Sequence, residues 1–424
     1  MSTLPGAPFL ARVGSELQLD GHALAALAPL FGTPLFVYSR AAMLAALADY
    51  QTALHGRPHL ICYAIKANSS LAVLQTFAQA GCGFDIVSAG ELARVLAAGG
   101  EPGKVVFSGV GKTRAEMQWA LQVGVRCFNV ESLGELDRLN EVAVSIDRVA
   151  PVSLRVNPDV DAGTHPYIST GLKGNKFGIA HDEALAAYRH AAALPGLRVQ
   201  GIDCHIGSQI TQIEPYLDAL DRLLDLVEAV EASGIPVHHV DVGGGLGITY
   251  TDEAVPSAEH LVRRLLQRLD ARGHGQREML FEPGRSLVGN AGVLLTEVLY
   301  LKPGAQKNFC IVDAAMNDIV RPALYQAHMG IEPCTLRTDA ACTWDVVGPV
   351  CESGDWLGRD RSLAVQPGDV LAVLSAGAYG MTMSSNYNTR PRAAEVMLDG
   401  QHVHLIRARE TVAELFANER VISD

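Results

Sequence analysis

The chain has 424 residues, of which 48% are hydrophobic and 19% charged, the composition of an ordinary globular protein long enough for two domains. Its formal net charge is −12, and such a chain repels phosphate backbones and anionic membranes, so we expect neither a nucleic-acid nor a membrane partner. No apolar run is long enough to span a bilayer, and the N-terminus lacks the basic start and apolar stretch of a secretory signal, which predicts a cytoplasmic protein.

Eight cysteines are scattered along the chain without a CxxC pair. This pattern predicts neither a disulfide framework nor a zinc site, so we expect no bound metal. Most of the thiols should be small buried apolar groups. The cysteines are Cys62, Cys82, Cys127, Cys204, Cys310, Cys334, Cys342 and Cys351.

Short β-rich runs alternate with helical stretches from about residue 58 to 285. Eight strand-and-helix units predict a closed parallel (β/α)8 barrel of the TIM type, in the α/β class. Two helices open with similar phrases at Ser88 and Ser132, and each fits a capping box with a glutamate three residues later. The predicted strands are residues 59–65, 83–87, 105–108, 125–130, 152–157, 199–206, 237–242 and 278–283.

The pattern changes after Gly289 to short β-type runs separated by turn signals such as QPGD and LDGQ, which predicts a mainly antiparallel β domain. The N-terminal run ELQLDG alternates in the same way, so we expect the first residues to pair with the C-terminal sheet. The predicted division is a barrel domain at 36–285 and a discontinuous β domain at 1–35 and 286–424.

Unusual polar residues fall at the carboxyl ends of the predicted barrel strands, where barrel enzymes build their sites. Scattered structural residues would not be expected to gather on one rim. The set comprises Lys66, Asp85, Ser108, Arg155, Asn157, His205, Gly243 to Gly245, Glu282 and Arg285.

Lys66 ends the first barrel strand, in the segment YAIKAN. A buried lysine costs free energy unless it is paired or neutral, so chemistry is a natural use for it. A desolvated amine loses its proton near neutral pH and can attack a carbonyl to form a Schiff base. A strand-end lysine that reaches solvent is the plain alternative.

Three further features of the rim suit a cofactor, and each has a plain structural alternative. The run GGGLG from Gly243 could bring N–H groups onto phosphate oxygens or form only a tight turn, and it matches neither a P-loop nor a dinucleotide fingerprint. Glu282 could hold a proton on a ring nitrogen or pair with Arg285. His205 could lay its flat ring against a cofactor or be an ordinary core histidine. Together with Lys66, these features describe pyridoxal phosphate (PLP).

The segments YAIKAN, GFDIVSAGEL, HIGSQ, GGGLG, EPGR and CESGD, in this order, resemble the fold type III PLP-dependent decarboxylases, which share a barrel and β-domain architecture with alanine racemase. The similarity covers essentially the whole chain and is greatest to the members that act on diaminopimelate. It implies decarboxylation of meso-2,6-diaminopimelate to L-lysine and CO2, the last step of lysine biosynthesis. It also implies a homodimer with shared active sites.

The resemblance assigns roles to individual residues. Lys66 resembles the lysine that binds the cofactor covalently, and Cys351 resembles the acid that protonates the carbanion, supplied by the other subunit. The implied cofactor contacts are Lys66, Asp85, His205, Ser208, Gly243, Gly244, Gly245, Glu282, Gly284, Arg285 and Tyr379. The implied contacts to the amino-acid substrate are Arg285, Arg321, Tyr325, Glu352 and Tyr379.

Cys351 lies among polar and small residues in CESGD, unlike the other seven cysteines, which favours an exposed thiol able to exchange a proton. Its acidic neighbours Glu352 and Asp355 would favour the protonated thiol, which suits a proton donor. An inert loop cysteine is the alternative. The segment from His165 to Gly171, HPYISTG, is expected to be a mobile loop over the site or an ordinary solvent loop.

Related activities stay open from the sequence. An ornithine-type or carboxynorspermidine decarboxylase would share Lys66, Glu282 and Cys351 but need another distal pocket, and the complete CESGD favours diaminopimelate. Alanine racemase fits less well, because its corresponding acid is a tyrosine and its ring-nitrogen partner an arginine. A noncatalytic PLP-binding paralogue is disfavoured by the presence of both Lys66 and Cys351.

Overall fold

The computed structural model describes residues 4–163, 170 and 175–422. The chain divides into two compact units, a barrel unit of residues 46–248 and 254–286 and a β unit of residues 1–45, 249–253 and 287–424. The predicted loop from His165 to Gly171 lies outside the described residues, apart from Thr170. Within the described ranges, no helix combines the length and the apolar character needed to cross a membrane.

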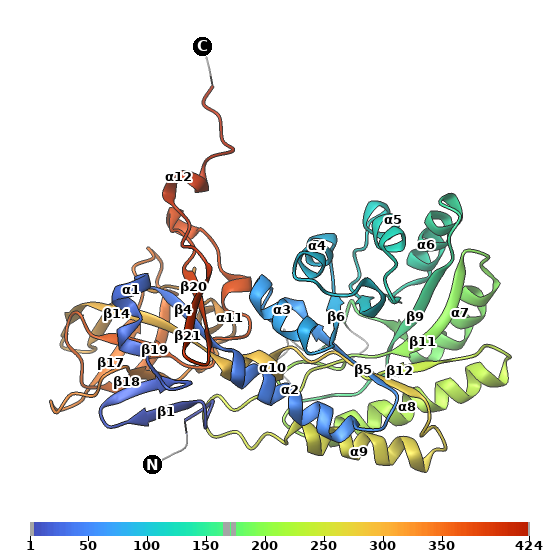
Figure 1. The fold of residues 1–424 in the computed structure, drawn as a ribbon, viewed down its shortest axis with the longest axis horizontal. Helices are drawn as coiled ribbons and strands as arrows, with labels where there is room; N and C mark the ends of the chain where they lie inside the picture. Colours follow the sequence, from blue (N-terminus) through green and yellow to red (C-terminus); the bar gives the residue numbers. More distant parts are fainter. Residues whose placement is uncertain (1–3, 164–169, 171–174, 423–424) are drawn as a thin grey trace. The chain divides into compact units, whose positions relative to one another are not determined.

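The barrel unit is a closed ring of eight parallel strands, which confirms the predicted fold (Figure 1). The strands are β5 (His59–Ala64), β6 (Gly83–Ile86), β7 (Val105–Phe107), β8 (Cys127–Val130), β9 (Ala150–Asn157), β11 (Leu197–Asp203), β12 (His239–Asp241) and β13 (Glu278–Phe281). Parallel pairing of β13 with β5 and of β8 with β9 closes the ring. A two-residue strand, β10 (Ile179–Ala180), pairs with β9 and was not predicted.

Helices lie on the outside of the barrel strands (Figure 1). They are α3 (Leu71–Gln79), α4 (Ala89–Ala97), α5 (Arg114–Val123), α6 (Leu133–Ser145), α7 (His181–Ala193), α8 (Glu214–Ala232) and α9 (Ala258–Ala271). In α9 the buried residues Leu261, Val262, Leu265, Leu266 and Leu269 follow a spacing of three and four, so one apolar stripe faces inward. This packing leaves the loops that follow the strands to carry the polar residues.

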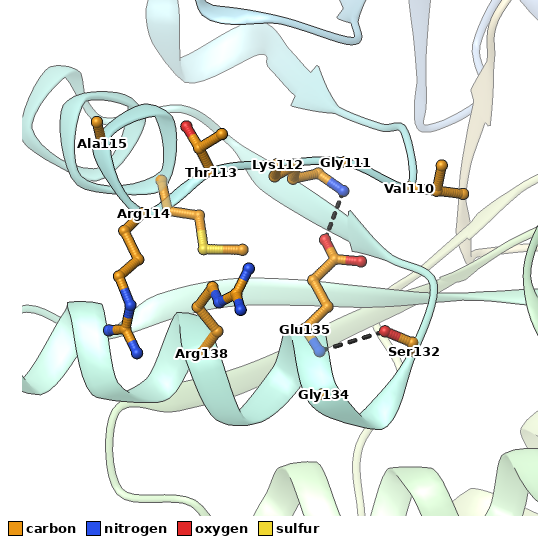
Figure 2. A pocket seen from close by; sticks show the side chains of 11 residues that line it. Val110, Gly111, Lys112, Thr113, Arg114, Ala115, Ser132, Gly134, Glu135 and Arg138 are labelled. Atoms are coloured by element: carbon orange, nitrogen blue, oxygen red, sulfur yellow. Dashed lines mark hydrogen bonds and ion pairs between the residues drawn. The ribbon is translucent and has the colours of Figure 1, made fainter.

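Helices α4 and α6 begin with serine N-caps, as their shared opening phrase predicts. Ser88 Oγ accepts a hydrogen bond from the Glu91 N–H, and Ser132 Oγ accepts one from the Glu135 N–H, both at 3.2 Å (Figure 2). The second half of the predicted capping box differs, because each glutamate accepts from the N–H of the residue before the serine, at 2.7 and 2.9 Å. Each glutamate therefore ties a strand-to-helix loop to the helix start.

Glu135 also binds a buried lysine. Lys112 Nζ donates to Glu135 Oε1 at 2.6 Å and to the carbonyl oxygens of Gly109 and Asn129, both at 2.7 Å. A lysine side chain with no exposed surface is thereby satisfied. The pair lies beside a cavity of about 710 Å³ lined by the starts of α5 and α6 (Figure 2). None of the predicted site residues lines this cavity.

The β unit contains a nine-stranded, mainly antiparallel sheet, as predicted. Its strands are β4 (Leu35–Ser39), β14 (Gly292–Lys302), β15 (Phe309–Val312), β16 (Ile331–Pro333), β17 (Cys342–Val347), β18 (Trp356–Leu363), β19 (Val370–Val373), β20 (Ala394–Asp399) and β21 (His402–Arg407). Strand β14 pairs antiparallel with β15, β19 and β4. Pairings of β15 with β17 and of β20 with β4 are parallel.

Short helices complete the β unit and the connections between the two units. They are α1 (Ala28–Phe31), α2 (Arg40–Leu54), α10 (Arg285–Val288), α11 (Arg321–Tyr325) and α12 (Val412–Leu415). Helix α2 includes residues of both units, and α10 does the same. Arg285 therefore starts a helix that continues directly from the last barrel strand into the β unit.

The N-terminal residues join the β unit partly as predicted. Glu16 forms an antiparallel bridge with Thr335, and the Leu17 N–H donates to the Cys334 oxygen at 2.8 Å, so this run does pair with a C-terminal segment. The run ELQL forms β2 (Glu16–Leu19) in a separate small sheet with β1 (Leu10–Val13) and β3 (His22–Ala23). Strand β4 enters the large sheet instead, between β14 and β20. All five β4 residues are buried, as expected for a strand of the large sheet that is covered on both faces, whereas β2 alternates buried and more exposed residues.

Candidate active site

Lys66 lies at the carboxyl end of β5, in a short 3-10 turn of residues Ile65–Ala67. Its Nζ donates to Asp85 Oδ2 at 2.6 Å, from the neighbouring strand β6. The Lys66 side chain is 37% exposed and that of Asp85 is fully buried. Burial therefore does not deprive the amine of water, as we expected from the sequence. An ion pair with a buried carboxylate holds the ammonium group instead, which fixes the position of Nζ.

Glu282 follows the last barrel strand and is buried, with 5% of its surface exposed. Asn129 Nδ2, on β8, donates to Glu282 Oε1 at 3.2 Å, and Ser108 Oγ lies 3.5 Å from the same oxygen. Arg285 Nη2 donates to Ser208 Oγ at 3.0 Å. Glu282 thus accepts from neutral groups across the barrel, and Arg285 binds a serine hydroxyl on the loop after β11.

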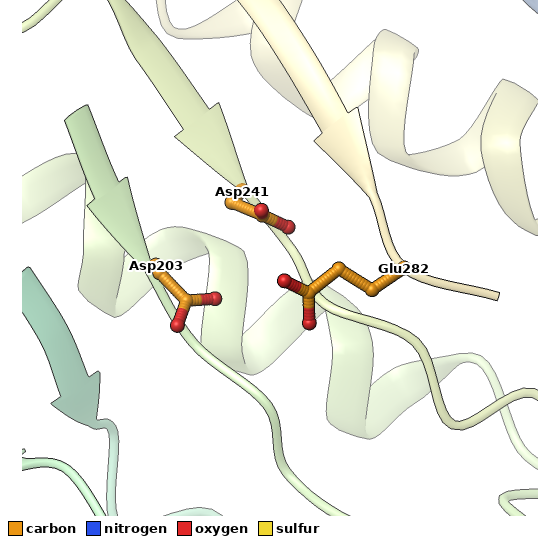
Figure 3. Close-up of side chains that lie close together, drawn as sticks. All are labelled: Asp203, Asp241 and Glu282. Atoms are coloured by element: carbon orange, nitrogen blue, oxygen red, sulfur yellow. The ribbon is translucent and has the colours of Figure 1, made fainter. Parts of the chain in front are cut away.

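Two aspartates stand close to Glu282. Asp203 ends β11 and Asp241 ends β12, and one carboxylate oxygen from each of the three acids lies within 4.8 Å of the others (Figure 3). Burial, and then the negative charges of Asp241, Asp85 and Asp203, raise the pKa of Glu282 well above its usual value. Burial also raises the pKa of Asp241 to about 7. This end of the barrel therefore binds protons strongly.

His205 follows β11 and is half-buried. The Gly244 N–H donates to His205 Nδ1 at 3.2 Å, so the proton of the neutral ring belongs on Nε2. Burial, with the positive charges of Arg155 and Lys66, lowers the pKa of His205 well below its usual value. The ring is therefore a neutral flat surface, which suits stacking against a protonated heteroaromatic ring better than an imidazolium would.

The three glycines after β12 allow three loops to approach one another. A Cβ at Gly243 would lie 2.4 Å from the Cys204 oxygen, one at Gly244 would lie 2.0 Å from the Glu282 oxygen, and one at Gly245 would lie 2.3 Å from the Gly207 oxygen. Gly243 and Gly245 also have positive φ angles of 67° and 104°. The glycines are required for packing, whatever they bind.

The N–H groups of the glycine run have different uses. Gly243 N–H donates to Asp241 Oδ1 at 2.9 Å, and Gly244 N–H is used by His205. Of the predicted phosphate contacts, Gly245 and Ser208 are therefore best able to face an anion, and Arg285, predicted to contact cofactor and substrate, lies beside Ser208. Gly284 completes the rim, because a Cβ there would lie 3.0 Å from that of Ala67, beside the Lys66 turn.

The β unit carries the remaining predicted site residues. Arg321 begins α11, is buried, and places its guanidinium 4.6 Å from the centre of the Tyr250 ring. Tyr325 ends the same helix. Tyr379 has a positive φ of 56°, an unusual conformation for a residue with a side chain. The roles of these residues stay predictions.

Cys351 is exposed, as predicted, and its N–H donates to Asn388 Oδ1 at 3.0 Å. It is not the only exposed cysteine, because Cys342 is exposed too, while the other six are buried as expected. The adjacent Glu352 accepts a hydrogen bond from Tyr387 and raises the pKa of that phenol. Asp355 is turned inward, where it accepts from backbone N–H groups. Asp355 is therefore part of the loop structure.

Three buried residues of the site were missed in the sequence. Asn129, Asp203 and Asp241 are polar residues inside apolar strand runs, and that was the signal that could have found them. All three lie within the same group as Glu282, which the sequence did identify.

The residues at this rim fit pyridoxal phosphate in their chemistry. The amine of a fixed lysine matches the cofactor's aldehyde, and a neutral flat ring matches its aromatic ring. A buried carboxyl group with raised proton affinity matches the pyridine nitrogen, and an arginine beside a serine hydroxyl matches the phosphate. The orphaned Oδ1 of Asp85 is a further polar atom at this rim that a ligand could satisfy.

Comparison with known proteins gives a consistent result. Residues 40–289 match the family model described as pyridoxal-dependent decarboxylase, pyridoxal binding domain. The chain is 60% identical over 408 residues to diaminopimelate decarboxylase of Pseudomonas aeruginosa, covering 96% of this chain and 98% of the relative. It is 58% identical over 409 residues to diaminopimelate decarboxylase of Vibrio cholerae, with the same coverage.

Solved structures show the same similarity. The structure of diaminopimelate decarboxylase from M. jannaschii in co-complex with L-lysine has a TM-score of 0.94 and 38% identity, and the match covers 99% of each chain. The Helicobacter pylori enzyme of the same name, complexed with L-lysine, has a TM-score of 0.89 and 40% identity, with 93% of this chain and 98% of that chain covered.

Proposed function

Because the chain belongs to the diaminopimelate decarboxylases, within the pyridoxal-dependent decarboxylase family, we propose that it converts meso-2,6-diaminopimelate to L-lysine and CO2. This is the last step of lysine biosynthesis. The observation that carries the proposal is the identity of 60% over nearly the full length of a diaminopimelate decarboxylase. The site residues at the barrel rim agree with it in chemistry. The cytoplasmic location expected from the sequence stays a prediction.

Lys66 would hold pyridoxal phosphate covalently, through Nζ. The ion pair with Asp85 keeps Nζ at a fixed point of the rim, and the buried carboxylate balances the positive charge of the amine. When bound, the cofactor supplies a ring that accepts the electron pair left by the departing CO2. Asp85 would hold the Lys66 ammonium group by this ion pair whenever Nζ is not bound to the cofactor.

Glu282 and His205 would control two properties of the bound cofactor, the protonation of its ring nitrogen and the access of water to its ring. Glu282 holds a proton at the ring nitrogen, because its own carboxyl group binds protons strongly. His205 covers one face of the ring as a neutral imidazole and excludes water from it. Ser208, Gly245 and Arg285 would bind the phosphate end.

The β unit would supply the substrate and proton-donor residues. Arg321, Tyr325, Glu352 and Tyr379 are proposed to contact the distal amino-acid group, where a charged grip rejects analogues that lack it. Cys351 is proposed to deliver a proton to the substrate carbon in the other subunit of a homodimer. Its exposure in the described chain is what such a role requires.

Substrate choice tests the proposal directly. We expect CO2 release from meso-diaminopimelate by the purified, cofactor-loaded protein, with ornithine and arginine decarboxylated at least about a hundredfold more slowly, because a site built for the distal groups leaves buried polar groups unpaired with an analogue. Product L-lysine is measured beside the CO2. Faster turnover of ornithine would instead indicate the ornithine-type activity, and absence of turnover with a bound cofactor would indicate a noncatalytic paralogue.

A further inference from the structure

Three buried carboxyl groups converge at the carboxyl ends of three neighbouring barrel strands. Asp203, Asp241 and Glu282 point toward one another from β11, β12 and the end of β13 (Figure 3). Their exposed fractions are 1%, 0% and 5%. Three buried negative charges this close repel one another strongly, so the arrangement needs a compensating positive charge or a proton.

The nearest cations, Lys66 and Arg155, lower the pKa values of the trio's acids, but each also has a carboxylate partner of its own. Lys66 is bound to Asp85 at 2.6 Å, and Arg155 Nη1 lies 3.4 Å from Glu131 Oε1. The three acids therefore outnumber the cations that face them. The other titratable groups that face the trio are Tyr188 and the buried thiols of Cys62, Cys127 and Cys204, which carry no positive charge.

Two carboxylate oxygens of the trio point to the missing component. Asp203 Oδ1 and Asp241 Oδ2 are buried without a hydrogen-bond partner among the described residues. The other Asp241 oxygen accepts from the Gly243 N–H, and one Glu282 oxygen accepts from Asn129. A proton between two carboxylates would give the orphaned oxygens a bond and reduce the repulsion at once.

We propose that Asp203 and Asp241 share a proton with Glu282 and act as positioning residues that keep this end of the site protonated. The inference rests on the proposed function only in naming Glu282 as the ring-nitrogen partner. In the protein without cofactor, the proton lies within the trio. With cofactor, the same negative charges favour the proton on the ring nitrogen, and Glu282 accepts the hydrogen bond from it.

The protonated carboxyl group can be counted in the cofactor-free protein. Infrared spectroscopy distinguishes a protonated carboxyl from a carboxylate, and we expect the wild-type protein to retain at least one protonated buried carboxyl at pH 7. Asp203→Asn and Asp241→Asn remove one charge with little change of shape, so the remaining acids should lose their proton at a pH lower by about one unit or more. In their cofactor-loaded forms the alkaline side of the kcat profile should shift to lower pH, because fewer negative charges then hold the proton at this end of the site.

A matched control is available in the β unit. Asp318 is a buried aspartate whose pKa burial raises to about 6, so Asp318→Asn should remove only its own contribution and leave the trio's signal intact. If the Asn variants do not fold, the spectrum of Asp318→Asn decides, because the trio is intact in that variant and Asp318 no longer contributes to the signal. A wild-type protein with all buried carboxyls ionised at pH 7 overturns the proposal, and so does a stoichiometric metal ion found at the trio.

The proposed function can fail separately. A protein that shows the protonated trio but releases no CO2 from meso-diaminopimelate would retain this inference and lose the function. A protein that releases CO2 but shows no protonated carboxyl would retain the function and lose this inference. The same holds if both Asn variants titrate as the wild-type protein does.

Discussion

At the scale of single residues, the site depends on burial and charge placement together. Lys66 is partly exposed, and the buried partner Asp85 determines where its amine points. His205 and Glu282 have pKa values displaced in opposite directions by the same surroundings, the first lowered and the second raised. The imidazole of His205 is therefore held neutral, while the surroundings of Glu282 favour a bound proton.

Replacing Asp85 tests the role of the ion pair. Asp85→Asn should leave the fold intact but free the Lys66 amine, so we expect turnover to fall by about tenfold to a hundredfold while cofactor binding weakens less. Steady-state kinetics and absorbance near 420 nm measure the two effects. Asp137→Asn, on the exposed surface of α6, is the control, because it removes a carboxylate from an ion pair with His190 in which both side chains are exposed. Unchanged turnover in Asp85→Asn would show that the Lys66–Asp85 ion pair does not contribute to catalysis.

The His205 ring should stay neutral through the physiological range. Because the pKa of His205 is lowered in the folded protein, the unfolded state binds more protons, and its contribution to stability falls as pH decreases through the usual histidine range. We expect the His205 resonance in an NMR titration of the cofactor-free protein not to shift between about pH 6 and pH 8. Protonation near pH 6.5 would contradict the neutral-ring assignment.

At the scale of elements, the barrel strands were predictable because each is a short apolar run between turn signals, and all eight were found. Strand β4 was missed, since its buried run LFVYS stands directly before helix α2 and was assigned to no sheet. Strand β10 has only two residues and gives no periodic signal. The polar residues Asn129, Asp203 and Asp241 were missed because the strand runs looked apolar as a whole. Closure of the barrel is what brings them close to Glu282, and the strand runs alone do not show that.

The glycine run should tolerate no side chain at its centre. Gly244→Ala would place a Cβ 2.0 Å from the Glu282 carbonyl oxygen, so we expect the free energy of unfolding to fall by about 1–3 kcal/mol and the Glu282 loop to shift. Gly134→Ala is the matched control, because a Cβ there meets nothing within 4 Å. Urea unfolding of the cofactor-free proteins measures the difference, and equal stability of the two variants would contradict the required close approach.

At the scale of the whole molecule, the sequence predicted both a barrel and a mainly antiparallel β domain. It did not predict which N-terminal strand joins the large sheet, because β2 and β4 are both short and apolar enough for either place. Assembly between subunits leaves no readable pattern in a single chain. The homodimer therefore rests on the resemblance alone, and it can be tested by mixing variants.

Complementation tests whether Cys351 acts across a subunit boundary. Lys66→Ala and Cys351→Ala should each be nearly inactive alone, while a refolded mixture should regain about a quarter of wild-type activity, because half of the dimers are mixed and each mixed dimer has one intact site. Cys342→Ala, the other exposed cysteine, should remain fully active and is the control. A mixture no more active than its components would place Lys66 and Cys351 in the same subunit or remove Cys351 from the reaction.

Covalent attachment of the cofactor at position 66 is the most direct test of the account. The loaded protein is reduced with borohydride, digested, and the labelled peptide is identified by mass spectrometry. We predict one label per chain, on the peptide containing Lys66, and none in Lys66→Ala. A label on another lysine, or no label in a protein that still decarboxylates meso-diaminopimelate, would contradict it.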